Sequence, residues 1–274
     1  MSGQRGIRLL LADVDGTLVT DDKVLSEDAI AVSRELRRAG IALALVSSRP
    51  PRGLRMLVEP LALDTVIAGC NGGVIVNPDL SVIETHLLDS DAAGQAVDLM
   101  LGRGLDVWVY TAVDWLVRDG EAPHVAREAW ILKFDARAVA SFTAADLARA
   151  VKIVGVSDDP ALVAACERVA QDALGETASA TRSQSFFLDV THPEANKGAV
   201  AVGLSRRLGI PPDQIATIGD MPNDVLMFRR SGLSIAMGNA SDAVKAQASA
   251  VTETNGNEGF AKAVRKYILA PSAA

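Results

Sequence analysis

Apolar residues recur with two different spacings along the first 70 residues. Residues 7–14 form a nearly continuous apolar run, which predicts a strand buried on both faces. Apolar positions three to four residues apart follow Ser26, so a helix capped by Ser26 is predicted over 26–40. Residues 41–46 and 65–68 predict two more strands. Strands that alternate with helices predict right-handed crossovers and a parallel sheet.

The pattern changes in the middle of the chain. Short apolar runs, some of them alternating with polar residues, predict strands at 74–76, 82–87, 106–110, 115–118, 151–156 and within 177–190. Helical spacing predicts helices over 92–101, 123–131 and 160–174. Strands joined as hairpins are typical of an antiparallel α+β unit. The three tryptophans fall here and are interpreted as part of its core: Trp108, Trp115 and Trp130.

The closing part of the chain returns to the first pattern. It predicts strands at 215–218, 233–237 and 250–253, and helices over 199–208, 225–230, 243–248 and 260–269. The expected fold class is α/β, with a Rossmann-like, doubly wound parallel sheet as the core. We expect residues 1–84 and 187–274 to form this core, and residues 85–186 to form an inserted α+β cap.

Polar side chains follow the predicted core strands at the points where those strands end. Because the carboxyl ends of parallel strands meet at one edge of a sheet, these residues predict a single site. In chain order they are Asp13, Asp15 and Gly16, then Ser47, Ser48 and Arg49, then Asn71 and Gly72, and finally Asp220, Asn223 and Asp224. Lys197 opens a predicted helix just before the last of these strands.

These residue types suit phosphoryl transfer. Four carboxylates in one site favour a hard divalent cation, and oxygen ligands with room for water suit Mg²⁺. Gly16 allows a sharp turn and a close approach of ligand to backbone. The hydroxyl of Ser47 can donate to a phosphate oxygen, and Lys197 can neutralise its charge. A carboxylate in such a site can form an aspartyl-phosphate.

Each of these features has a simpler explanation when taken alone. Asp-x-Asp-Gly occurs in turns and calcium loops, although Val24 occupies the position where an EF-hand has glutamate. Ser47 alone suits a helix cap, and Lys197 alone suits a solvated surface. His86 and His192 form no recognisable metal or triad arrangement with their neighbours. The succession of polar groups after consecutive strands is what favours one functional site.

Charge and composition limit the partners. The 274 residues include 27 basic and 34 acidic side chains, giving a net charge of −7. This balance disfavours nucleic acid and anionic membrane surfaces as partners, but it permits a small anionic substrate. Two cysteines are too few for a disulfide framework, and no apolar run is long enough for a signal peptide or membrane span. We expect a cytoplasmic protein, monomeric or homodimeric.

Several motifs resemble those of the haloacid dehalogenase superfamily, and in particular its Cof-type phosphatases. The resemblance covers the whole chain, including a long insertion where this class carries an α/β cap. Ser47-Ser48 is a departure, because Cof-type phosphatases usually have Thr-Gly before the arginine. The matching segments are Leu11–Leu18, Ser47–Arg49, Asn71-Gly72, Asn196–Gly198 and Gly219–Asp224.

The resemblance implies a role for each matching residue. Asp13 would be the nucleophile, and Asp15 would protonate the leaving alcohol and then activate water. Mg²⁺ would be held by the Asp13 carboxylate, the Asp15 backbone carbonyl and Asp220, with Asp224 supporting its waters. The phosphate-binding and orienting residues would be Lys197, Gly16, Ser47, Ser48, Arg49, Asn71, Gly72 and Asn223.

The function implied is a magnesium-dependent phosphatase that acts on a small phosphorylated metabolite, with a sugar phosphate as the favoured class. Two alternatives stay open. A phosphomutase of the same superfamily would retain the phosphate in its product. A regulator on the same fold would bind a phosphorylated metabolite without turning it over.

Overall fold

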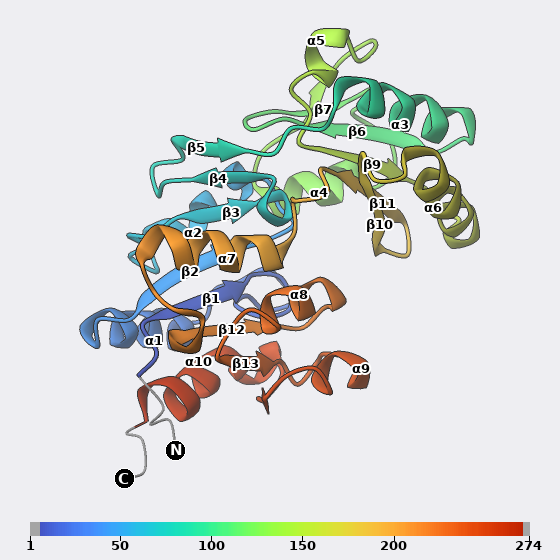
Figure 1. Ribbon diagram of the computed structural model, residues 1–274. Coiled ribbons are helices and arrows are strands. Elements are labelled where there is room, and N and C mark those ends of the chain that lie inside the picture. Colours follow the sequence, from blue (N-terminus) through green and yellow to red (C-terminus); the bar gives the residue numbers. More distant parts are fainter. Residues whose placement is uncertain (1–5, 271–274) are drawn as a thin grey trace.

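The computed structural model describes residues 6–270, which fold into two units built on separate sheets (Figure 1). Within this range one sheet has eight strands and the other has six. The eight-stranded sheet contains both the early and the late parts of the chain. The six-stranded sheet is formed by the middle part, as the sequence predicts, and the α/β fold class is confirmed. No helix in the described range is long and apolar enough to cross a membrane.

The core sheet is parallel except at one edge. Strands β1, β2, β3, β12, β13 and β14 run parallel, while β4 and β5 add antiparallel pairs beside β3. The spatial order is β14-β13-β12-β1-β2-β3-β4-β5, which places the first strand at the centre. The bounds are β1 Leu9–Asp13, β2 Ala42–Val46, β3 Ile67–Gly69, β4 Val74–Val76, β5 Val82–Thr85, β12 Ile215–Gly219, β13 Leu233–Ala236 and β14 Ala250–Val251.

Helices cover both faces of this sheet. Alternate residues of β1 explain why, since Leu10 and Ala12 pack on one face while Leu9 and Leu11 pack on the other. The first face is covered by α1 (Glu27–Arg38), α2 (Arg55–Val58), α10 (Gly259–Ala263) and the π-helical turn Val264–Leu269. The second face is covered by α7 (Lys197–Leu208), α8 (Val225–Phe228) and α9 (Asp242–Lys245).

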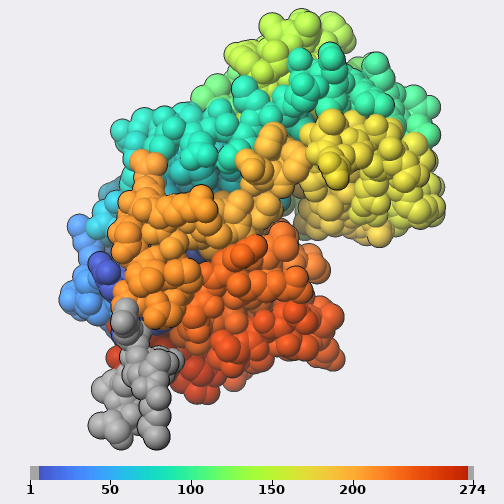
Figure 2. Space-filling view, viewed as in Figure 1, coloured from blue at the N-terminus to red at the C-terminus, as the bar shows by residue number. Residues whose placement is uncertain are grey.

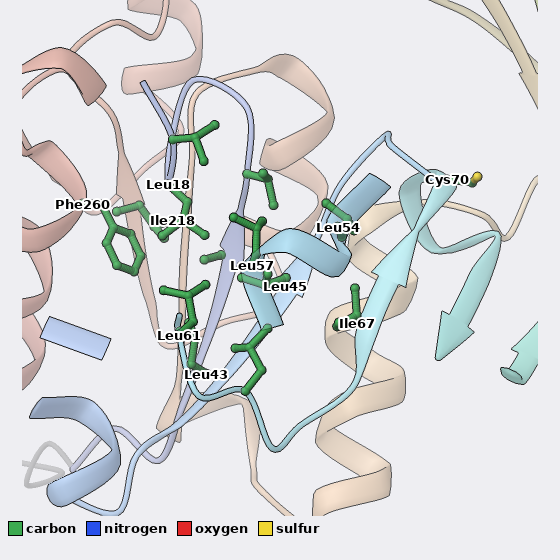
Figure 3. Close-up of a cluster of buried hydrophobic side chains, with 14 of the residues drawn as sticks. Leu18, Leu43, Leu45, Leu54, Leu57, Leu61, Ile67, Cys70, Ile218 and Phe260 are labelled. Carbon is green, nitrogen blue, oxygen red and sulfur yellow. The ribbon is translucent and has the colours of Figure 1, made fainter. Parts of the chain in front are cut away.

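Short 3₁₀ turns connect several of these elements. They are Pro51–Leu54, Cys70–Gly72, Pro212–Gln214, Pro222–Asp224 and Asn255–Asn257. The segment after β2 packs its leucines against that strand, and Figure 3 shows Leu43, Leu45, Leu54 and Leu57 in one cluster. Burying such a side chain contributes about 1.5–3 kcal/mol each. The helical turn at 51–58 was not predicted from the sequence.

The second unit is a mostly antiparallel sheet with helices on both faces. Its order is β10-β11-β9-β6-β7-β8, and only the β7–β8 pair is parallel. Its strands are β6 Asp106–Tyr110, β7 Trp115–Val117, β8 Arg137–Ala138, β9 Lys152–Val156, β10 Ser179–Gln184 and β11 Phe187–Thr191. Its helices are α3 Ser90–Gly102, α4 Val125–Leu132, α5 Ala144–Leu147 and α6 Pro160–Leu174. Helices α3 and α6 pack on its outer face, while α4 packs on the face turned toward the core.

Three details of this unit differ from the sequence prediction. Strand β8 and helix α5 were not predicted, because a two-residue strand and a four-residue helix leave almost no periodic signal. Trp108 and Trp115 are buried, but Trp130 is 48% exposed and is not part of the core. Trp130 instead packs its ring under the ammonium group of Lys133, 4.4 Å from the ring centroid.

The chain crosses between the two units twice. The first crossing follows β5, which ends at Thr85, and the second follows β11, which ends at Thr191, five residues beyond the expected boundary at 186. The crossings also bring His86 together with His192 and Glu194, whose ligand atoms lie within 4.8 Å of one another. The expectation that these histidines have no metal-like arrangement with any neighbour was therefore wrong.

The packing of β2 predicts a large loss of stability when Leu45 is truncated. Leu45 is fully buried in a central strand, so Leu45→Ala leaves a cavity and should lower the free energy of unfolding by about 2–5 kcal/mol. Leu208→Ala is the matched control, because Leu208 is 38% exposed at the end of α7. Equilibrium denaturation in urea measures both. Equal losses in the two variants would contradict the assignment of the core.

Candidate active site

The strand order brings the predicted polar residues to one edge of the core sheet. Strand β1 lies between β12 and β2, with Asp13 in register with Val46 and Ala12 with Ile218. Ser47 directly follows Val46, and Asp220 follows Ile218 after one glycine. The parallel register thus explains how Asp13, Ser47 and Asp220, far apart in the sequence, come to one place.

Lys197 links two of the carboxylates. Its ammonium nitrogen lies 2.6 Å from Asp13 Oδ1 and 2.6 Å from Asp224 Oδ1. The side chain of Asn196 caps α7 by accepting from the amide of Ala199, which places Lys197 in the first helical turn. Lys197 is only 2% exposed. A buried ammonium group between two carboxylates offsets part of the cost of burying them.

Asp224 shapes the loop that carries Asp220. Its second oxygen accepts from the amides of Asp220, at 2.9 Å, and Met221, at 2.8 Å. Gly219 permits this contact, because a Cβ there would lie 2.3 Å from Asp224 Cγ. Both oxygens of Asp224 therefore already have partners within the chain.

Asp220 is held from two other loops. Thr17 donates to its Oδ1 at 3.4 Å, and Asn239 donates to its Oδ2 at 3.1 Å and to the carbonyl of Gly16 at 2.9 Å. Gly16 has a φ of +78°, and a Cβ at that position would lie 2.3 Å from Asp220 Oδ2. Only glycine fits this turn without displacing the carboxylate.

The charges of the site are unbalanced, and the pKa values reflect this. Burial raises the pKa of Asp13 to about 8 despite the opposing charge of Lys197. Burial and the neighbouring Asp224 raise the pKa of Asp220 to about 6. Positive charge added beside these groups would stabilise their ionised forms.

The donor set fits a hard divalent cation. Asp13 Oδ2 is buried and accepts no hydrogen bond from any residue in the described range. One carboxylate oxygen each from Asp13, Asp220 and Asp224 lies within 4.8 Å of the others. Carboxylate oxygens in such a cluster are the ligands that Mg²⁺ prefers, and among the described residues Asp13 Oδ2 is the one of them that has no hydrogen-bond partner.

Asp15 has a different environment from Asp13. Arg49 binds its two oxygens at 2.6 and 2.7 Å, and Lys23 lies 2.8 Å from Oδ1. Burial alone would raise the pKa of Asp15, but the hydrogen bonds and charge of Arg49, with those of Lys23, outweigh it and lower the pKa below its usual value. Arg49 also donates to the carbonyl of Ile131 at 3.1 Å and so contacts the end of α4.

Asp13 and its neighbours lie at one end of a cavity of about 600 Å³ between the two units. In the space-filling view the yellow part of the inserted unit and the orange part of the core separate on this side (Figure 2). The predicted residues on its wall are Asp13, Asp15, Gly16, Ser48, Arg49, Asn71, Lys197, Asp220 and Asn223.

Three predicted residues are not on that wall. Ser47 is buried, and its Oγ accepts from the amide of Arg49 at 3.1 Å, an interaction that shapes the loop. Gly72 lies against α7, where a Cβ would be 2.5 Å from Val200 Cγ2. Asp224 is fully buried beneath the loop of Asp220. Asn71, by contrast, accepts from Asn223 at 3.2 Å and links the third and fifth predicted segments.

Several residues of the site were missed from the sequence. Asn239 lies three residues beyond the end of β13, so the rule of strand ends applies to it as well. Lys23 pairs with Asp15 from a turn that shows no periodic signal. Lys152 and Asp189 line the cavity from β9 and β11, where each is a lone charge in an otherwise apolar strand.

Comparisons with known proteins agree with this geometry. A family model of haloacid dehalogenase-like hydrolases matches residues 10–264. The chain is 28% identical to the 5-amino-6-(5-phospho-D-ribitylamino)uracil phosphatase YcsE of Bacillus subtilis, over 98% of this chain and 100% of that protein. It is 26% identical to the pyridoxal phosphate phosphatase YbhA of Escherichia coli, over 96% of this chain and 99% of that protein.

The fold is also that of solved relatives. The crystal structure of a haloacid dehalogenase-like hydrolase from Bacteroides thetaiotaomicron superposes with a TM-score of 0.87. It is 25% identical and covers 95% of this chain and 99% of its own. The match of the family model to nearly the whole chain, together with these relatives, shows that the protein belongs to the haloacid dehalogenase-like hydrolases and is a phosphatase of that superfamily.

Proposed function

We propose that this protein is a magnesium-dependent phosphatase that hydrolyses a small phosphorylated metabolite, with a sugar phosphate as the favoured class, through an aspartyl-phosphate on Asp13. One observation carries the proposal. Lys197 holds one oxygen of the buried Asp13, while the other oxygen has no partner in the described range, and Asp13 is part of the cavity wall. A carboxylate fixed on one side and free on the other suits nucleophilic attack.

In the first step Asp13 Oδ2 attacks the phosphorus atom, and the bond from phosphorus to the leaving alcohol oxygen breaks. Lys197, Arg49 and the backbone amides after β1 face the charge that develops on the phosphoryl oxygens. Ser47 contributes by holding the amide of Arg49, and hence the loop, in place. Asn71 and Asn223 position the neighbouring loops through their mutual hydrogen bond.

Asp15 acts as the general acid in the first step and as the general base in the second. Its carboxyl gives a proton to the leaving oxygen, and its carboxylate then takes a proton from the water that attacks the aspartyl-phosphate. The second attack releases phosphate and restores Asp13. Arg49 favours the ionised form of Asp15 in the free enzyme. A phosphoryl group that draws Arg49 toward itself weakens this pair, which ties protonation of Asp15 to substrate binding.

Asp13, Asp220 and the backbone carbonyl of Asp15 would hold Mg²⁺, with Asp224 acting through the loop that it fixes. The cation supplies charge stabilisation to the phosphoryl oxygens when it is bound. Thr17 and Asn239 keep Asp220 turned toward this position. The raised pKa values of Asp13 and Asp220 support the proposal, because burial, and after it the neighbouring carboxylates, disfavour the ionised forms unless positive charge is added.

The inserted unit, expected over residues 85–186 and extended by β11, is the proposed cap that selects the substrate. Support comes from the cavity, whose walls combine core residues with Trp108, Tyr110 and Lys152 of the inserted sheet. The curated relatives are named for phosphorylated compounds that carry a ring, one a ribitylamino-uracil and one pyridoxal phosphate. Closure of such a unit over the site would exclude water from the first step.

The test is phosphate release from a panel of phosphorylated sugars, polyols and vitamers with Mg²⁺ present. We expect turnover by the wild type and a loss of at least about 10³-fold in kcat for Asp13→Asn, because the amide is not a nucleophile. Asp22→Asn is the control, since Asp22 is an exposed aspartate nearby. Phosphate that stays on a rearranged product would favour the mutase, and tight binding without turnover would favour the regulator.

Removal of the metal has an expected effect on stability as well as on activity. The wild type treated with a chelator should gain thermal stability when Mg²⁺ is added, by about 2.7 kcal/mol at a hundred times its Kd. Asp220→Asn should abolish this gain without lowering the stability of the metal-free protein, because it relieves carboxylate repulsion. Differential scanning calorimetry measures both. An unchanged Mg²⁺ response in Asp220→Asn would contradict the proposed ligand set.

A further inference from the structure

The face of the inserted sheet that is turned toward the core carries a buried carboxylate. Strand β11 alternates, with Leu188 and Val190 packed on the outer helices and Asp189 on the opposite face, in the wall of the cavity. Asp189 is 4% exposed, and neither of its oxygens accepts a hydrogen bond from the described residues. A buried carboxylate in this condition is costly unless something else donates to it.

Lys152 accounts for the charge of Asp189 but not for its hydrogen bonds. The ammonium nitrogen of Lys152 lies 3.5 Å from Asp189 Oδ2 and donates to the carbonyl of Ser48 at 3.2 Å. It also lies 4.9 Å from the centroid of the Tyr110 ring. The ammonium group therefore has the Ser48 carbonyl, the Tyr110 ring and Asp189 as its neighbours. Lys152 places Asp189 and attaches β9 to the loop after β2, while the carboxylate keeps its accepting capacity.

Aromatic side chains form the wall beside Asp189. Trp108 and Phe187 line the same cavity, with ring centroids 5.1 Å apart. Trp108 lies opposite Val154, and Val154 lies opposite Asp189, in the registers of the three neighbouring strands. A flat or C–H-rich molecular face can pack on these rings while its polar edge reaches Asp189.

We infer that Asp189 binds the leaving group of the substrate, and that this leaving group carries two adjacent hydrogen-bond donors at its end away from the phosphate. A carboxylate offers two oxygens side by side, so neighbouring hydroxyls, or a hydroxyl beside an amine on a ring, match it. The inference rests on the proposed function, because the phosphate is taken to lie at Asp13. In this inference Asp189 determines which phosphate esters the enzyme prefers.

A site of this kind discriminates against substrates that leave its buried carboxylate without hydrogen-bond donors. An ester without donors would leave both buried oxygens of Asp189 without a hydrogen-bond partner, as they are among the described residues alone. We therefore expect the wild type to prefer donor-bearing esters over donor-free esters of the same size.

The experiment compares two matched pairs of esters. Erythritol 4-phosphate is paired with n-butyl phosphate, and 3,4-dihydroxybenzyl phosphate with benzyl phosphate, so that each pair differs chiefly in its donors. For Asp189→Asn we expect kcat/KM to fall about 10- to 100-fold for the donor-bearing ester of at least one pair. For the donor-free esters we expect a change of less than about threefold. The pair that responds tells whether the donors belong to a polyol or to a ring.

Asp98→Asn is the matched control, because Asp98 is an exposed aspartate on α3 of the same unit. It should leave all four esters unchanged. A parallel fall for both members of each pair in Asp189→Asn would mean a structural role only, and no fall in either would mean no role; both results overturn the inference. If the wild type cleaves none of the four esters or any of the wider panel, the proposed function itself fails, and the inference fails with it.

Asp189→Asn removes one member of a buried ion pair, so a second variant guards against loss of folding. The double variant Lys152→Met, Asp189→Leu replaces both charges by apolar side chains of similar size, which is often tolerated in buried pairs. It should keep the cleavage of n-butyl and benzyl phosphate to within about tenfold while losing the preference for donors. Retention of the preference in the folded double variant would overturn the inference.

Discussion

The contact of Lys197 with Asp13 and Asp224 is the interaction on which the rest of the site depends. Three carboxylates converge where the central strands end, and one buried ammonium group lies between two of them at 2.6 Å from each. Without that charge, burying the cluster would cost several kcal/mol per ion. Lys197 does not neutralise all three carboxylates. Burial and the neighbouring carboxylates keep the pKa values of Asp13 and Asp220 raised. The remaining demand for positive charge is the physical basis of the proposed Mg²⁺ dependence.

The core carries the clustered carboxylates, and the inserted unit forms the opposite wall of the cavity. Two contacts join them at the site: Arg49 donates to the carbonyl of Ile131, and Lys152 donates to the carbonyl of Ser48. Both involve the loop after β2, which also contacts Asp15 through Arg49. Under the proposed mechanism this loop would connect the position of the inserted unit to the protonation of Asp15.

Much of the core site was predictable from the sequence, because the carboxyl ends of parallel strands converge in a way that needs no knowledge of side-chain contacts. Asp13 and Asp220 are found together for this reason, and Lys197 joins them from the first turn of α7. The direction of individual side chains was not predictable: Ser47 turns into its own loop, and Gly72 packs on Val200. The residues of the inserted wall were missed because the docking of two sheets decides whether Lys152 or Asp189 faces solvent, core or cavity.

The central claim is that Asp13 becomes phosphorylated, and covalent trapping tests it most directly. The enzyme is mixed with a ³²P-labelled ester from the panel that it cleaves, quenched in acid within one turnover, digested and analysed by mass spectrometry. The account predicts one labelled peptide, with the phosphate on Asp13 as an acyl phosphate that hydroxylamine removes. Label on another residue, or turnover with no covalent label under conditions that slow the second step, would contradict it.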